Sequence, residues 1–574
     1  MLRRLFPILD WLPVYQSTWL KGDISAGLTV GIMLIPQGLA YAMIAGLPPV
    51  YGLYAAIFPQ LIYSIFGTSR QISVGPVAMD SLLVASGISV MASQGTDAYL
   101  TLVLLLTAFM GMLQLSLGII KLGFITNLLS RPVISGFTSA AAIIIGLSQM
   151  KHILGIQINQ SNSIIKLGRA LFGQLSSTHL LTLGMGIGAI VLILALKKYR
   201  KNFPGALVAV AVGTGFTFLF GLQKMGVNIV AEIPSGLPQI GFPNLTWALF
   251  VEMLPLAMTL AVISFMESYS VSKSLESKSR SYKVLPNKEL IALGLSNIVG
   301  SLFQAFPVAG GFSRSAVNYQ SGANTPLAGI ISAIIVLVTL LFLTPLFYYL
   351  PHAVLGAIIL VAISSLIDWE YILRLWKDSK LEFILLIATL IITLLFSMVA
   401  GIVTGIILSI LLLLYHQAYP HIAELGRLKG HHEFRNVKRF KNLEIWDDIL
   451  ILRLDASLTF INIQYFKEYI ETEVKLRPRG TLKSLIIDAG PVGYLDASGC
   501  AGLTDIMEYL DGKKIELLIC DVIGPVRDIM SRTGLHEIIH KEHVFLDLNE
   551  AVKYATTHQT GDYQEYALQS NNEV

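Results

Sequence analysis

The feature that most constrains the fold is a succession of long apolar stretches that fills the first 420 residues. Many windows of about 20 residues carry no charged side chain, and a helix needs that length to cross a bilayer. We count about fourteen such windows, with a margin of about two. The chain is 54% hydrophobic and only 14% charged over 574 residues, which is more apolar than soluble domains usually are. The sequence therefore predicts a multi-pass helical membrane protein.

Basic residues in the loops predict its orientation. If the N-terminus is cytoplasmic, alternating spans place most basic groups on that same side: Lys121, Arg131, 197–201, 273–283, Arg374, Lys377 and Lys380. Arg70 is then expected on the outer side. Because positive loops stay in the cytoplasm, we expect both termini there.

Composition changes near residue 420, so residues 1–420 are predicted as a transport domain and 421–445 as a basic linker. Short β-rich runs follow, and strands are expected at 449–454, 484–488 and 515–520. Helices are expected at 497–510 and after Pro525. Alternating strands and helices predict a small α/β domain over 446–560. The final segment, 561–574, is polar and predicted to be disordered.

Two polar segments, 72–78 and 308–321, interrupt the apolar runs. Paired Gly- or Pro-containing breaks in two halves of a membrane protein indicate a transporter's binding site. They lie about 235 residues apart, which suggests two halves of about seven spans, and an odd number inverts the second half. Arg314 lies in the second break, where a cation must face protein, water or an anion.

A helix that begins inside the membrane exposes its first N–H groups and the positive end of its dipole, and so attracts anions. Two such ends facing each other would form an anion site. Pro76 suits the first turn of one helix, and the glycines let the chain approach closely. The remaining contributors are Gly75, Gly310, Gly311, Ser313, Arg314 and Ser315. For 72–78 alone, an ordinary kinked helix is the alternative.

Several motifs resemble those of the SulP/SLC26 anion transporters. Asp23–Gly31 with Ile35–Tyr41 looks like the family's first span, and Pro49–Tyr54 looks like its signature. Ser73–Ala78 resembles the third span and Phe312–Tyr319 the tenth. The tail is similar to a STAS domain. The resemblance implies about fourteen helices in a 7+7 inverted repeat, with UraA-like core and gate domains and a cytoplasmic STAS domain. It also implies a homodimer.

The resemblance also implies which residues line the substrate site, where the short third and tenth helices meet. They are Gln37 and Tyr41 from the first span, Val77 and Ala78 from the third, and Ser313, Arg314 and Ser315 from the tenth.

Glu267 lies near the end of a long apolar run. Burial there would favour the protonated carboxyl group unless a cation compensates, so Glu267 is a candidate proton carrier. The alternative is a surface glutamate at the cytoplasmic helix end, because Lys273 follows closely. Family members with glutamate here resemble proton-coupled sulfate carriers, whereas those with aspartate include sodium-coupled bicarbonate carriers.

Asp80 departs from the family, which usually has an apolar residue there. It lies one turn beyond Pro76, and it could pair with Arg314, stay protonated or face the gate domain. An interhelical hydrogen bond or a packing role is favoured over contact with substrate.

In the tail, Ser498 matches the position phosphorylated in soluble STAS proteins, and Asp496 matches the neighbouring acid. A helix cap formed by Ser498 or Asp496 is the favoured alternative. Cys500 and Cys520 have no metal-ligand spacing and are expected to be buried thiols. His431–His432 lacks partner ligands, so no metal is expected.

The sequence thus predicts a secondary active transporter in the inner (plasma) membrane, with proton-coupled sulfate uptake by alternating access as the favoured function. A bicarbonate or dicarboxylate carrier, including a sodium-coupled one, and an uncoupled anion channel are the alternatives. A nucleobase transporter should not need Arg314. We expect no enzyme activity, cofactor or nucleic-acid partner. Membrane lipid and a regulatory protein that binds the STAS domain are the other expected partners.

Overall fold

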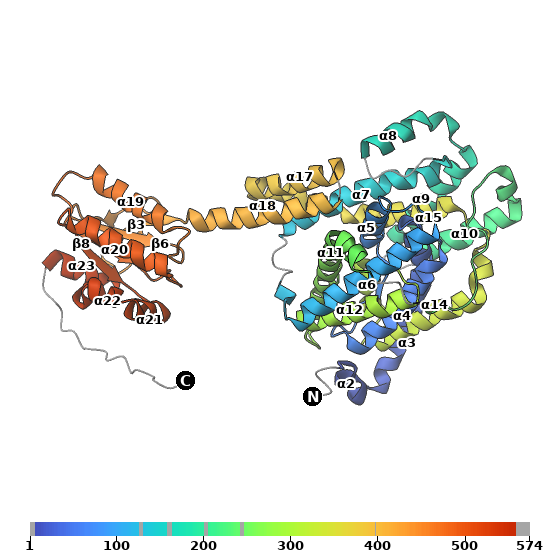
Figure 1. Cartoon of the computed structure of the whole chain (residues 1–574), viewed down its shortest axis with the longest axis horizontal. Helices are drawn as coiled ribbons and strands as arrows, with labels where there is room; N and C mark the ends of the chain where they lie inside the picture. The colour runs from blue at the N-terminus through green and yellow to red at the C-terminus, as the bar shows by residue number, and fades with distance from the viewer. Residues whose placement is uncertain are drawn as a thin grey trace. The chain divides into compact units, whose positions relative to one another are not determined.

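The structure is a computed structural model that describes residues 6–124, 130–157, 164–199, 205–241, 246–396 and 398–557. It contains two compact units, Met1–Ser409 and Ile410–Val574. The first is a bundle of helices and the second an α/β domain, coloured blue to yellow and orange to red (Figure 1). The predicted disordered tail, 561–574, lies outside the described residues.

The bundle is built from helices that follow one another along the chain. In order they are α2 (Ile8–Trp11), α3 (Ser17–Ile44), α4 (Val50–Phe66), α5 (Ala78–Ile88), α6 (Asp97–Ile119), α7 (Arg131–Leu154), α8 (Ile164–Gly173), α9 (Leu180–Tyr199), α10 (Gly205–Phe220), α11 (Trp247–Ser279), α12 (Pro286–Leu302), α13 (Phe312–Gln320), α14 (Leu327–Val338), α15 (His352–Ile363), α16 (Trp369–Asp378), α17 (Lys380–Leu395) and α18 (Met398–Ala418).

Within the described part of the chain, seven helices are long and apolar enough to cross a membrane, and four shorter helices are apolar. The prediction of a multi-pass helical protein is therefore confirmed. The predicted number of fourteen spans stays a prediction, because several helices fall below the length of a full span.

Both predicted breaks are real interruptions. β1 (Val74–Gly75) pairs antiparallel with β2 (Ala309–Gly310). α5 begins shortly after β1 and α13 directly after β2, with 11 and 9 residues. At about 1.5 Å per residue, each spans roughly half of a 30 Å bilayer core. The backbone at 74–75 is extended, so the alternative of an ordinary kinked helix is wrong.

One detail of the first break differs from the prediction. Pro76 is not in the first turn of a helix, because α5 has Val77 as its N-cap and begins at Ala78. Asp80 is the third residue of α5. Because Pro76 lies outside this helix, the two residues do not share a helix face. The carbonyl oxygen of Pro76 is left free to accept a hydrogen bond from elsewhere.

The helices pack in two groups whose contacts repeat. In one group α3 packs along α14 and α6 along α11, while α4 contacts α14 and α12 contacts α6. In the other, α7 contacts α15 and α17, and α9 contacts α15 and α10. The α3–α14 contact thus corresponds to the α11–α6 contact, and α4–α14 corresponds to α12–α6. Such matched contacts between the two halves of the chain are expected for an inverted repeat.

α3 and α4 touch backbone to backbone. A Cβ atom added at Gly38 would lie 2.9 Å from the carbonyl oxygen of Gly52, and one at Gly52 would collide with the Gly38 carbonyl group. Small residues permit such close approach between membrane helices. The contact fixes α3, which carries part of the candidate site, against α4.

The prediction that Arg70 lies on the side opposite the N-terminus is wrong. Arg70 lines a cavity together with Trp19, at the start of α3, and Lys278, at the end of α11. Its guanidinium lies 5.9 Å from the ring centroid of Tyr282. Because α3 and α4 are two successive spans, the chain returns to the end where it started. Arg70 therefore joins the other basic residues at that end, which strengthens the charge asymmetry.

The second unit contains a 7-stranded sheet in which β3, β6, β7, β8 and β9 are neighbours in that order, β3 is antiparallel to β6, and the others are parallel. Its strands are β3 (Ile422–Leu428), β4 (Phe434–Asn436), β5 (Leu443–Glu444), β6 (Ile449–Leu454), β7 (Ser484–Asp488), β8 (Glu516–Cys520) and β9 (Val544–Phe545). The helices are α19 (Ile463–Leu476), α20 (Ala497–Asp511), α21 (Gly524–Arg532), α22 (Leu535–Ile538) and α23 (Leu548–Thr557). The predicted strands and helices of this domain are confirmed.

The segment 421–445 is not a linker, because it contributes β3, β4 and β5 to the sheet. Ala423 and Leu425 are buried. The charges that suggested a linker pair with each other across the sheet edge, as Arg427 Nη2 does with Glu444 Oε2 at 2.6 Å. Short strands whose outer face is charged resemble a linker in composition.

Alternate residues of β6 build two cores. Leu450 and Leu452 pack with residues of α19, α20 and α21 on one face, whereas Ile449 and Ile451 pack with α23 on the other. Because strand side chains alternate between faces and both faces are covered here, four successive residues, 449–452, are all apolar. Cys500 and Cys520 are both free and buried, as predicted.

Replacement of Gly52 by alanine should destabilise the bundle, because the added methyl group meets backbone rather than a movable side chain. Overpacking of this kind costs about 1–3 kcal/mol. We expect a lower thermal unfolding midpoint for the purified full-length protein in detergent. Gly184→Ala in α9 is the matched control, since no atom lies within 4 Å of its added Cβ. Equal midpoints for the two variants would contradict the close helix contact.

Candidate functional site

Arg314 is the third residue of α13 and is only 2% exposed. Its Nη1 donates to the carbonyl oxygen of Pro76 at 2.8 Å and to Oε1 of Gln37 at 3.3 Å. Its Nε and Nη2 are buried and have no partner among the described residues. The charged N–H groups on these two nitrogen atoms are therefore left for something else, and unpaired buried donors are costly.

The guanidinium folds back over the start of its own helix. A Cβ atom at Gly311 would lie 2.7 Å from Arg314 Cζ, so only glycine leaves room for this arrangement. Gly311 is also the N-cap of α13. The glycine predicted to allow close approach thus makes space for the arginine itself.

The starts of both half-helices are uncapped by side chains. The N-cap residues are Val77 for α5 and Gly311 for α13, and neither forms a side-chain cap. The first backbone N–H groups of each helix therefore have no intrahelical acceptor. Since β1 pairs with β2, the two positive helix ends lie at the same level of the bundle, which suits an anion.

The sequence-predicted site residues differ in exposure. Gln37, Tyr41 and Val77 are buried, Ala78 is half-buried and Ser313 is exposed. α3, which carries Gln37 and Tyr41, contacts both α5 and α13. The structure therefore brings the first, third and tenth predicted elements together around Arg314.

Ser315 has a different arrangement from the predicted donor. Its hydroxyl donates to the carbonyl oxygen of Gly311 at 2.7 Å and accepts from the backbone N–H of Ser73 at 2.9 Å. The hydroxyl proton is therefore already used. Ser315 fastens one broken segment to the other, and Gly311 N–H repeats the link by donating to Ser73 O at 3.0 Å.

Two carboxylates lie near the arginine. Asp80 is fully buried and neither of its oxygens has a hydrogen-bond partner among the described residues. Glu267 Oε2 is likewise buried without a partner, and Glu267 interacts electrostatically with both Arg314 and Asp80. One guanidinium and two carboxyl groups thus share a single buried region.

The alternative of a surface glutamate is wrong for Glu267. α11 continues to Ser279, about three turns beyond it. The hydroxyl of Ser264, on the neighbouring helix α11, interacts with the Asp80 carboxyl group and donates to the carbonyl oxygen of Val308 at 3.3 Å. The packing or interhelical role favoured for Asp80 stays a prediction.

Sequence reasoning missed the polar residues that hold the breaks in place. Asn297 Oδ1 accepts from Val308 N at 3.0 Å, and Ser268 Oγ accepts from Gly310 N at 2.7 Å. Gln60 Oε1 accepts from Val74 N at 2.6 Å. Amides and hydroxyls inside otherwise apolar helices were the available signal, because a buried polar group needs a partner.

The comparisons with known proteins agree with this architecture. Residues 20–389 match the sulfate permease family and residues 441–551 match the STAS domain. The chain belongs to the sulfate permease family. It is 37% identical over 566 residues to "Sulfate transporter 4.1, chloroplastic" of Arabidopsis thaliana, covering 96% of this chain and 82% of that protein.

Solved structures give the same assignment. The murine Slc26a9 anion transporter in the inward-facing state superposes with a TM-score of 0.89 at 26% identity, covering 97% of this chain and 94% of that chain. The transmembrane domain of the cyanobacterial bicarbonate transporter BicA gives a TM-score of 0.61 at 26% identity, over 68% of this chain and 98% of that chain. The protein is thus a membrane anion transporter of the SulP/SLC26 type with a C-terminal STAS domain, and not an enzyme.

In the STAS domain, Asp496 is the N-cap of α20. Its Oδ1 accepts from Gly499 N at 2.7 Å, and its Oδ2 accepts from Phe460 N at 2.9 Å. Ser498 is exposed in the first turn of the helix. The predicted cap is confirmed and is supplied by Asp496.

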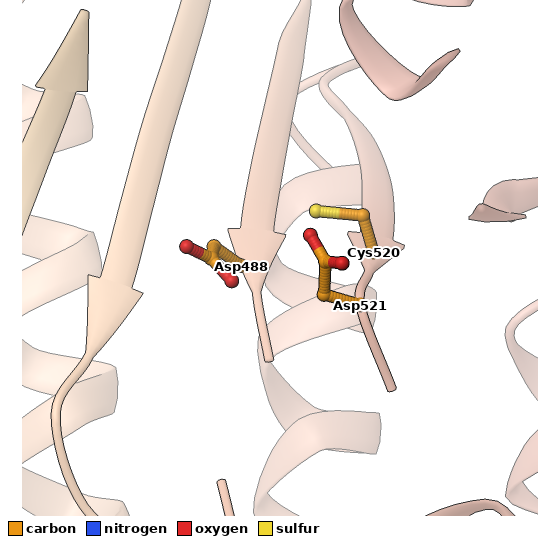
Figure 2. Close-up of side chains that lie close together, drawn as sticks. All are labelled: Asp488, Cys520 and Asp521. Carbon is orange, nitrogen blue, oxygen red and sulfur yellow. The ribbon is translucent and has the colours of Figure 1, made fainter. Parts of the chain in front are cut away.

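Pairing of β7 with β8 brings together residues that lie far apart in sequence. Asp488 ends β7, and Cys520 and Asp521 lie at the end of β8 (Figure 2). Their ligand atoms lie within 4.8 Å of one another. Burial, followed by the nearby carboxylates, raises the pKa of the Cys520 thiol, and burial raises the pKa of both aspartates. A protonated thiol is a poor metal ligand, so we assign no function to this cluster.

Replacement of Asp496 by alanine should loosen the first turn of α20, because the Gly499 N–H in that turn loses its acceptor, as does the Phe460 N–H of a neighbouring segment. Loss of an N-cap costs about 1 kcal/mol, equivalent to a roughly fivefold faster amide exchange there. Hydrogen exchange of the full-length protein measures this. Ser498→Ala is the matched control, and an equal effect of both variants would contradict the assignment of the cap.

Proposed function

We propose that this protein takes up sulfate together with protons by alternating access. The observation that carries the proposal is the buried Arg314, whose Nε and Nη2 have no partner among the described residues and lie beside two uncapped helix starts. A guanidinium matches an oxyanion in geometry, since adjacent N–H groups donate to adjacent oxygens. The name of the similar Arabidopsis protein supports sulfate as the anion.

Sulfate carries only hydrogen-bond acceptors, so a site for it should offer donors. Arg314 and the first N–H groups of α5 and α13 meet this requirement. We include Gln37, Tyr41, Val77, Ala78, Ser313 and Ser315 in the site, with Ser315 acting through the position of Gly311. Gln37 already binds the guanidinium, so it orients the arginine toward the anion.

Charge balance supports proton coupling. With Asp80 and Glu267 both ionised, the region around Arg314 is net negative and repels a divalent anion. A proton on Glu267 removes one of these charges. We infer that Glu267 is the proton carrier, because it interacts electrostatically with Arg314 as well as with Asp80. The incoming proton and sulfate would then favour each other's binding.

The two packing groups of the bundle support alternating access. The half-helices lie in the group formed around α3, α6, α11 and α14, whereas α7, α9, α15 and α17 form the other group. Motion of one rigid group past the other would expose the site to each side in turn.

Bicarbonate is the second candidate substrate, because the chain is similar to the BicA transmembrane domain. Bicarbonate is also an oxyanion, but it is planar and monovalent. Competition separates the two: excess unlabelled sulfate should block labelled sulfate uptake, whereas bicarbonate should not.

We place the protein in the plasma (inner) membrane with both termini in the cytoplasm, because the basic residues gather at one end of the bundle. We also propose a homodimer in contact with membrane lipid, and control of the STAS domain by a regulatory protein or by phosphorylation of Ser498, which is exposed. Mass measurement in nanodiscs and phosphopeptide mapping test the dimer and the modification.

Arg314→Gln should lower sulfate uptake into proteoliposomes by about tenfold or more, because charged hydrogen bonds contribute about 1.5–3 kcal/mol. Arg374→Gln is the control, since that side chain is 64% exposed and forms a surface ion pair with Glu370. Unchanged uptake by the Arg314 variant would refute the proposed site. Accumulation above the external concentration distinguishes a coupled transporter from a channel.

Glu267→Gln should remove the dependence of uptake on pH, because glutamine resembles a permanently protonated glutamate. Wild-type uptake should rise as the external pH falls, whereas the variant should take up sulfate at a rate nearly independent of pH. Glu252→Gln, on the exposed face of the same helix α11, should keep the wild-type profile. A wild-type profile in the Glu267 variant would rule out the proposed role.

A further inference from the structure

A second polar cavity lies between α7, α9 and α15, away from the broken segments. Its volume is about 310 Å³, enough for a small oxyanion with several waters, each of which occupies about 30 Å³ in the liquid. The walls are formed by Lys151, His152, Ile156, Gln157, Thr182, Asn228, His352 and Ala353.

The polar side chains of this wall are suited to an anion. Lys151 can carry positive charge, and the imidazole N–H groups and the side-chain amides of Gln157 and Asn228 can donate hydrogen bonds. No carboxylate is among the lining residues. Lys151 also has no ion pair or hydrogen bond to another described residue, so its ammonium group is available to a ligand.

Two chain segments converge on the cavity from different halves of the bundle. His152 is near the end of α7 and His352 is the first residue of α15, and their ring centroids lie 5.6 Å apart. α15 has no side-chain cap, and its positive end lies at the cavity. His352 N donates to Asn228 O at 3.0 Å, which holds Asn228 at the rim.

A purely structural explanation accounts for part of this arrangement. Lys151 and His152 lie in the last turn of α7, where cations stabilise the negative end of a helix. This does not explain His352 at the positive end of α15, nor a cavity between them. Placement of Lys151 beside both histidines also disfavours a metal cation, because like charges repel.

We propose that this cavity is a second site for a small tetrahedral oxyanion, sulfate or a phosphate group, with Lys151 as its principal ligand. The cavity lies at the far end of α7 from Arg131, which starts that helix, and at the far end of α9 from Lys197, which is near its last residue. In the proposed orientation this is the outer side. Anions that arrive from outside would be concentrated here before they reach the central site.

The test measures equilibrium binding of radiolabelled sulfate to the full-length protein in phosphatidylcholine nanodiscs. Arg314→Gln serves as the background, because it weakens the central site and leaves the cavity intact. One saturable site should remain. Lys151→Met in this background should weaken it about tenfold or more, whereas Lys197→Met should leave it unchanged. Equal binding with and without Lys151→Met would overturn the proposal.

Further variants keep the test independent of folding and of the proposed function. Lys151→Arg should retain binding, and Asn228→Ala should weaken it even if Lys151→Met fails to fold. If Arg314→Gln leaves transport intact, the proposed function fails, but comparison of Lys151 variants still decides the cavity. Thermal stabilisation by zinc that depends on His152 and His352, with no effect of sulfate, would overturn the oxyanion site in favour of a metal.

A lipid phosphate is the other source of the same chemistry. If no sulfate binds in phosphatidylcholine, the protein should instead retain phosphatidylglycerol through purification, and Lys151→Met should abolish that retention. Mass spectrometry of the bound lipid measures this. Absence of both sulfate binding and lipid retention that depend on Lys151 would overturn the proposal.

Discussion

The structure depends on one buried cation. Arg314 is almost fully enclosed, and its hydrogen bond to the Pro76 carbonyl joins the two broken segments at the level where both half-helices begin. A guanidinium at the start of a helix is electrostatically unfavourable, because the helix dipole is positive there. Burial adds a desolvation cost. Such an arrangement is stable only beside negative charge, which Glu267 supplies inside the protein and a bound anion would supply from outside.

Contacts with the rest of the bundle stabilise the extended backbone of the two broken segments against a continuous helix. Pairing of β1 with β2 satisfies the extended backbone of each segment through the other, and Gln60, Ser268 and Asn297 bond the remaining groups. An irregular backbone inside a membrane requires such partners, because no water replaces them. The polar residues buried in α4, α11 and α12 therefore hold the two broken segments in place.

The sequence predicted features that have a local signal. The breaks were visible because Gly, Pro and Arg interrupt apolar runs, and the strands at 449–454 and 484–488 were visible because apolar residues cluster in short segments. Features that depend on distant partners were not visible. Ser315 uses its hydroxyl on the other broken segment, and 422–428 is a strand only because it pairs with β6. Arg70 was misplaced because a single span was miscounted.

The two half-helices differ in the charge at equivalent positions. The third residue is Asp80 in α5 and Arg314 in α13. An acid at a helix start is favoured by the dipole, and a base there is not, so the two halves of the repeat are electrostatically unlike. The start of α13 therefore carries a cation that needs a negative partner, whereas the start of α5 carries an acid that the dipole favours. Arg314 and Asp80 thus give the two helix starts opposite preferences for a charged partner, which agrees with the proposal of an anion site beside Arg314.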